Sequence, residues 1–182
     1  APRKMAATFS FAEGRVRTTL AQAVAAGSVV CLFPEGDSHD APHLRELKTG
    51  AARIFYRARE IARERDHSMT PSLIPVGLHY DHKRVFRSRA LVSFHPPMAL
   101  PDALDRDPGE DSDARMELQR ALTQEIFENL TEVVYATDDW RLHMLMHRAR
   151  KLVRAERAQR AGATLAKPNM KERVLGFARV HR

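Results

Sequence analysis

The sequence predicts an α/β fold, with a mixed, largely parallel sheet flanked by helices and a helical appendage at the C-terminus. Residues 28–33, SVVCLF, form a short continuous apolar run, which is typical of a strand covered on both faces. Helical periodicity precedes and follows this run, and two more strand-like runs come later. The order helix, strand, helix, strand, strand and then helices indicates α/β layers in the first hundred residues.

The individual elements follow from local patterns. The predicted helices share apolar residues spaced three and four apart, and they cover residues 11–26, 44–64, 114–135, 140–160 and 171–180. The other two predicted strands cover residues 72–80 and 90–95. Pro75 and Gly77 interrupt the first of these, which indicates an edge, a bulge or a strand end.

Charge and turn residues divide the chain into three parts. Residues 1–100 carry the α/β pattern, residues 101–113 form an acidic linker rich in turn residues, and residues 114–182 are a helical extension. From residue 141 onward there are 12 Lys or Arg against 2 Glu, within a total net charge of +7. Such a block favours an anionic membrane surface or nucleic acid, or it is a solvated helix face.

Other patterns exclude some classes of protein. No run of 18 apolar residues occurs, so the sequence predicts no transmembrane helix. The single cysteine, Cys31, excludes an internal disulfide and lies in an apolar run, where we expect a buried, inert thiol. The helix predicted over 140–160 has an apolar stripe that we expect to be core, formed by Leu142, Leu145, Met146, Ala149, Leu152 and Val153.

A polar turn, PEGDSHD, follows the predicted strand at residues 28–33. Ligands of α/β sheets gather at such carboxyl ends of strands. Glu35 can accept hydrogen bonds from hydroxyl groups, and Gly36 lets backbone amides approach a ligand. Lys48 lies near the start of the next predicted helix, whose N-terminus favours an anion. The turn therefore predicts a pocket for a phosphorylated polyol, with a plain strand-to-helix turn as the alternative.

The segments FPEGDSHD, LKTGAARI and LIPVGLHY closely resemble the glycerol-3-phosphate and 1-acylglycerol-3-phosphate acyltransferases, and the resemblance spans residues 15–155. It implies the glycerolipid acyltransferase type of α/β domain, of which residues 1–100 would be the C-terminal part. It implies transfer of a fatty acyl group from acyl-CoA or acyl carrier protein to glycerol-3-phosphate, dihydroxyacetone phosphate or lysophosphatidate, in phospholipid synthesis. It also implies no metal, no cofactor beyond the thioester co-substrate, and a peripheral location on the cytoplasmic face of a membrane.

The resemblance assigns residues to the site. Those that match the acceptor-binding block, or lie beside it, are Glu35, Gly36, Ser38, His39 and Lys48. Pro75 and Val76 match a block on the acyl-donor side, and Arg87 belongs to an FRSR segment that could contact donor phosphates or cap the sheet. Arg53 is either a helix-surface charge or a partner of Glu35.

The family's general base, a histidine in an H-x-x-x-x-D motif, is absent. None of the nine histidines is followed by an aspartate five positions later, so no catalytic residue is assigned in this chain. We expect the C-terminal part of an acyltransferase that needs the missing N-terminal part of the same polypeptide and is inactive alone. A degenerate, binding-only member is the alternative.

Other functions fit the residues less well. Ser38, His39 and Asp40 are adjacent, so they form a poor hydrolase triad, and no G-x-S-x-G elbow occurs. The histidine pairs 39/43 and 79/82 lack the spacing of a metal site. A non-catalytic basic protein that binds an anionic membrane surface or nucleic acid remains the alternative function.

Overall fold

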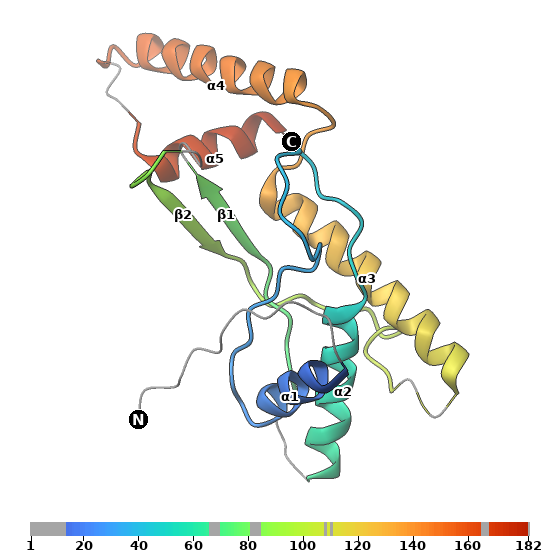
Figure 1. Ribbon diagram of the computed structural model, residues 1–182. Helices are drawn as coiled ribbons and strands as arrows, with labels where there is room; N and C mark the ends of the chain where they lie inside the picture. The colour runs from blue at the N-terminus through green and yellow to red at the C-terminus, as the bar shows by residue number, and fades with distance from the viewer. Residues whose placement is uncertain are drawn as a thin grey trace. The chain divides into compact units, whose positions relative to one another are not determined.

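The computed structural model describes residues 14–65, 70–80, 85–107, 109, 111–164 and 168–181, drawn in colour in Figure 1. Its elements in chain order are α1 (Gly14–Ala25), α2 (Gly50–Glu64), β1 (Val76–Tyr80), β2 (Ala90–Phe94), α3 (Ser112–Val134), α4 (Trp140–Arg160) and α5 (Met170–His181). They form two compact units. The first unit holds α1, α2 and most of α3, and the second holds β1, β2, α4, α5 and residues 40–44.

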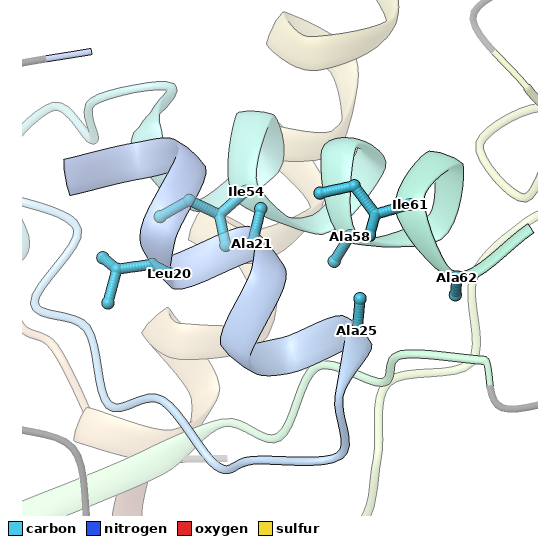
Figure 2. Close-up of a cluster of buried hydrophobic side chains, with 7 residues drawn as sticks. All are labelled: Leu20, Ala21, Ala25, Ile54, Ala58, Ile61 and Ala62. Carbon is cyan, nitrogen blue, oxygen red and sulfur yellow. The ribbon is translucent and has the colours of Figure 1, made fainter. Parts of the chain in front are cut away.

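The core of the first unit lies between α1 and α2. Ala21 and Ala58 are fully buried there, and their small side chains let the two helix backbones come close. Larger side chains fill the space around them, as Figure 2 shows. The buried cluster consists of Leu20, Ala21, Ala25, Ile54, Ala58, Ile61 and Ala62. This cluster fixes the direction of α2 and therefore the position of the loop that leads into it.

Residues 28–33 are not a strand, so that prediction is wrong. They are irregular, and their exposure alternates: Val30 and Leu32 pack on the α1–α2 core, whereas Val29 is 74% and Phe33 50% exposed. A strand needs a neighbour to pair its backbone groups, and these residues join no sheet in the described part of the chain. Cys31 is exposed, like Val29 and Phe33, which corrects the expectation of a buried thiol.

The predicted parallel sheet is likewise not found among the described residues. The sheet there has two antiparallel strands, with a register that runs from Val76 opposite Phe94 to Tyr80 opposite Ala90. Strand β1 begins directly after Pro75, which has no backbone N–H to give to a ladder. The predicted helices and the two later strands are confirmed, although β1 is shorter than predicted and the antiparallel pairing was not predicted. Helix α2 begins later than predicted because residues 44–49 belong to the loop before it.

Part of the predicted acidic linker is attached to α2. The buried hydroxyl of Tyr56 donates a hydrogen bond to the Leu104 carbonyl, 2.9 Å away. Arg59 pairs with Asp105 at 2.6 Å, and Arg63 pairs with Asp107. The last pair lowers the pKa of Asp107, chiefly through the hydrogen bond from Arg63.

Helix α4 has no buried residue, which corrects the prediction of a core stripe on it. Leu145 is 61% and Leu152 is 71% exposed. The side of α4 that meets α5 is polar: Arg150 donates to the Arg173 carbonyl, and a Cβ placed on Gly176 would lie 3.1 Å from Arg150 Cδ. The Arg150 side of α4 therefore packs on α5, close to Gly176, while Leu145 and Leu152 remain exposed.

In the part of the chain that the structure describes, no helix is both long and apolar enough to cross a membrane.

Candidate substrate-binding loop

Two backbone hydrogen bonds close the loop that carries the predicted site residues. The Lys48 amide donates to the Pro34 carbonyl at 2.9 Å, and the Gly36 amide donates to the Phe33 carbonyl at 3.1 Å. The first bond joins the two ends of the loop, directly after the irregular apolar segment and directly before α2. The loop is therefore anchored at both ends to elements of the α1–α2 core.

Glycine at position 36 is favoured by its backbone conformation, and it lies against a neighbouring side chain. Its φ of 77° lies in the left-handed region, which costs an L-residue free energy and glycine very little. A Cβ at this position would also lie 2.7 Å from Lys48 Nζ and 2.9 Å from Lys48 Cδ. The lysine side chain thus lies against the glycine backbone, and the two residues occupy one compact site.

The carboxylate of Glu35 holds the loop together from inside. Its Oε2 accepts a hydrogen bond from the Arg45 amide at 2.8 Å and lies 2.5 Å from His39 Nε2. Both side chains are mostly covered, with 20% of Glu35 and 11% of His39 exposed. Arg45 adds a second link through its guanidinium, which pairs with Asp37 at 2.9 Å. Glu35 is therefore an organiser of the loop as well as a hydrogen-bond acceptor.

The cationic side of the site is formed by Lys48 and the start of α2. Lys48 is exposed, and the helix begins at Gly50 after an N-cap residue, Thr49, whose side chain makes no capping hydrogen bond. The first amides of a helix have no intrahelical acceptor and lie at the positive end of its dipole. An ammonium group beside such amides can bind a phosphate. Ser38 is exposed at the same loop and can exchange hydrogen bonds with a hydroxyl.

The structure therefore brings together Glu35, Gly36, His39 and Lys48, with Ser38 beside them. Arg45 and Asp37 are additional loop residues that sequence reasoning missed. The backbone amide of Arg45 is the group that contacts Glu35, and a backbone contact leaves no signal in the residue type. An Asp and an Arg eight positions apart were the one available sign of the outer ion pair.

The other predicted residues lie elsewhere. Arg53 donates to Gln119 on α3 at 3.2 Å, which favours the helix-surface interpretation over a partnership with Glu35. Pro75 is buried before β1, and Val76 pairs with Phe94 in the hairpin. Arg87 is exposed, has a φ of 61°, and places its guanidinium 5.5 Å from the centre of the Phe86 ring. Val76 and Arg87 belong to the second compact unit.

The histidines considered as metal ligands do not gather into a site in the described residues. No group of three or more His, Cys, Asp or Glu is placed there to hold a metal ion. His79 stacks on Tyr135, and its pKa is lowered by burial and then by the charge of His95. Asp81 and His82 lie outside the described residues.

The chain is similar in sequence to known acyltransferases. The chain is 35% identical over 124 residues to glycerol-3-phosphate O-acyltransferase 2 of Saccharomyces cerevisiae, which is 68% of this chain and 16% of that protein. It is 29% identical over 132 residues to glycerol-3-phosphate O-acyltransferase 1 of the same yeast, 71% of this chain and 16% of that protein. It is also 29% identical over 133 residues to an uncharacterised acyltransferase of Schizosaccharomyces pombe, 73% of this chain and 19% of that protein. No family model and no solved structure matches.

The class that these matches define is the acyltransferases. Within that class, the chain is a relative of the glycerol-3-phosphate O-acyltransferases, which confirms the resemblance carried by its motifs. It spans less than a fifth of the length of the relatives named above.

Proposed function

We propose that this chain supplies the acceptor-binding loop of a glycerol-phosphate acyltransferase of phospholipid synthesis. The observation that carries the proposal is the closed loop in which Glu35 links Arg45 and His39 while Lys48 lies against Gly36. The names of the yeast relatives support glycerol-3-phosphate as the acceptor. Dihydroxyacetone phosphate and lysophosphatidate carry the same phosphate on a three-carbon skeleton and are the other candidate acceptors.

Each loop residue has a role in this proposal. Lys48 and the first amides of α2 bind the acceptor phosphate, because a cation and unpaired amides both favour an anion there. Ser38 and His39 exchange hydrogen bonds with the acceptor hydroxyls. Glu35 holds His39 and the Arg45 backbone in place and contributes an acceptor for a hydroxyl. Gly36 keeps the backbone close to the ligand.

The chemistry is attack of an acceptor hydroxyl on the carbonyl of a thioester, acyl-CoA or acyl carrier protein. An ester bond forms, the thiol leaves, and the hydroxyl proton must pass to a base. No histidine in these 182 residues has the H-x-x-x-x-D pattern of the family's base. We therefore propose that the isolated chain binds acceptor without transferring acyl groups, and that the reaction needs no cofactor beyond the thioester.

Binding of glycerol-3-phosphate to the 182-residue chain, measured by NMR shift changes and calorimetry, tests this proposal. Lys48→Ala should weaken binding, whereas Lys171→Ala, which removes an exposed lysine of α5, should leave it unchanged. Glycerol without phosphate should bind more weakly than glycerol-3-phosphate. Equal binding by the two variants would contradict the phosphate role of Lys48. Acyl transfer from acyl-CoA by the isolated chain would contradict its proposed inactivity.

The donor side and the location are further parts of the proposal. Pro75, Val76 and Arg87 are assigned to the acyl-donor side, with Arg53 supporting α2 through its contact with Gln119. The protein is proposed to act peripherally on the cytoplasmic face of a membrane, because the long-chain acyl-CoA donors and the acylated products of this class are amphiphilic. Retention of acyl-CoA binding in Arg87→Ala would remove that residue from the donor side.

A second candidate function is a non-catalytic basic protein that binds an anionic membrane surface or nucleic acid. Seven basic residues and one acidic residue in α4 support it. A salt-sensitive mobility shift with DNA, without binding of anionic vesicles or glycerol-3-phosphate, would favour the nucleic-acid form of this alternative.

A further inference from the structure

The apolar side chains of α4 form a stripe that is exposed instead of buried. We define the α4 stripe as Leu142, Leu145, Ala149, Leu152 and Val153. Their spacings of three, four and seven place them on one side of the helix. Four of them are large and range from 38% exposed at Leu142 to 71% at Leu152. The polar side of α4, which includes Arg150, is the side that packs on α5.

A helix of a globular protein usually turns its apolar side chains towards the core, and α4 does not. Burying a leucine side chain is favourable, yet the fold leaves these leucines in contact with solvent. Exposed apolar stripes of this kind mark surfaces where another molecule binds. Within the second compact unit, no described residue buries the α4 stripe.

Charges beside the stripe indicate the chemistry of the occupant. Arg141 and Arg148 lie along one edge of the α4 stripe and Arg157 along the other, while Glu156 is the one acidic residue of α4. All three arginines are exposed. A second copy of this chain would bring rows of arginines together, which is unfavourable. An anionic lipid surface instead offers hydrocarbon for the stripe and negative headgroups for the arginines.

We propose that the α4 stripe lies in the interface of an anionic lipid bilayer, with Leu145 and Leu152 inserted and the flanking arginines at headgroup level. This deepens the proposed membrane location by naming the surface that makes the contact. The helix lies along the membrane plane, since seven basic residues in α4 exclude it from the hydrocarbon core.

Co-sedimentation of the 182-residue chain with vesicles tests the proposal. Wild-type chain should bind phosphatidylcholine vesicles that contain phosphatidylglycerol, and added salt should weaken that binding. The double variant Leu145→Glu and Leu152→Glu should bind about tenfold more weakly or worse, because both apolar contacts are lost. Arg148→Ala should weaken binding to anionic vesicles by about fivefold.

Met144→Glu is the matched control. Met144 is 51% exposed on α4 but lies away from the α4 stripe, so the single glutamate there should weaken binding much less than Leu145→Glu alone or Leu152→Glu alone, each of which adds the same one charge. Circular dichroism establishes that the variants remain helical. Vesicle binding that is equal in wild type and the double variant would overturn the proposal. So would a wild-type dimer that the double variant converts to a monomer without change in vesicle binding, because a second copy would then cover the stripe.

The outcome is separable from the acyltransferase proposal. The vesicle assay contains neither acyl donor nor acceptor, and the α4 stripe shares no residue with the acceptor-binding loop. Failure of vesicle binding would leave the role of Lys48 intact, and failure of glycerol-3-phosphate binding would leave the lipid contact intact.

Discussion

Glu35 Oε2 lies 2.5 Å from His39 Nε2. The two residues are four positions apart in the sequence, which is about one turn of a helix, but they lie in a loop that is not helical. The same carboxylate oxygen also accepts the backbone amide of Arg45. One side chain therefore sets the positions of a ring and a backbone segment. Glu35, which the resemblance assigns to acceptor binding, therefore also determines the shape of the loop.

Replacing Glu35 with alanine should therefore loosen the loop. The change leaves the Arg45 amide and the His39 ring without this charged acceptor, and we expect a loss of about 1.5–3 kcal/mol in the free energy of unfolding. Hydrogen exchange of the Arg45 amide should also become faster. Glu46→Ala, at an exposed glutamate nearby in sequence, is the control and should change neither quantity. Unchanged exchange at Arg45 in the Glu35 variant would contradict the role of Glu35.

The pairing of Gly36 with Lys48 gives a second prediction. Gly36→Ala places a Cβ in a left-handed residue and against the lysine side chain, so two costs add. Gly109 has a similar φ of 65° but nothing within 4 Å of its Cβ position. Gly109→Ala should cost about 1 kcal/mol of unfolding free energy through backbone strain alone, and Gly36→Ala should cost more.

A double-mutant cycle isolates the contact itself. In a Lys48→Ala background, Gly36→Ala should cost less than in the wild type, because the crowding atoms are gone. Denaturant unfolding of the four proteins measures the coupling. A coupling near zero would show that the backbone conformation, and not the lysine, is what requires glycine.

The bond from Tyr56 to Leu104 gives a third prediction, on stability. Tyr56 is 2% exposed and donates to the Leu104 carbonyl, and burial raises the pKa of its hydroxyl. Tyr56→Phe removes the donor and leaves a buried carbonyl without it, so the free energy of unfolding should fall by about 1–2 kcal/mol. Tyr80→Phe, at a tyrosine that is 54% exposed, should change it by less than about 0.5 kcal/mol. Equal effects in urea unfolding would contradict the importance of this bond.

The success of sequence reasoning depended on whether a signal was local. The helical stripes in α2 and α3 and the presence of strands β1 and β2, though not their antiparallel pairing, were predicted, because periodicity and turn residues are local properties. The run Val29–Phe33 was misread because its apolar character does not determine whether a neighbouring strand pairs with it. The stripe of α4 was misread for a similar reason: periodicity locates an apolar face but does not say which face packs on α5, and in the structure it is the Arg150 side, close to Gly176.

For the candidate site, the residue types were predictable and their contacts were not. The motif indicated Glu35, Gly36 and Lys48 as one site, and the structure brings them together. The bond from the Arg45 amide to Glu35 could not be predicted, since every residue except proline has an amide to donate. Whether Arg53 contacts Glu35 or a surface residue depends on the position of α3, which carries its partner Gln119. No local sequence pattern predicts that position.

Two histidines on α4 give the last prediction, on pH. His147 Nε2 lies 3.2 Å from His143 Nε2, and the pKa of His147 is lowered to about 4. Burial is the largest cause, followed by the positive charges of Arg150, His143, Lys151 and Arg173. An unfolded chain would bind a proton at an ordinary histidine pKa of about 6.5. Between these two values the unfolded state binds more protons than the folded one, so stability falls as pH falls from about 6.5 towards 4.

His147→Gln should remove much of this dependence. We expect the wild type to lose about 1–2 kcal/mol of unfolding free energy more than the variant on going from pH 7 to pH 4.5, measured by urea unfolding at several pH values. Some dependence should persist, because burial also lowers the pKa values of His143 and His79. Met144→Gln, at an exposed residue of α4 that does not titrate, is the control and should keep the wild-type slope. The same slope in His147→Gln as in the wild type would show that His147 is protonated as readily in the folded chain as in the unfolded one.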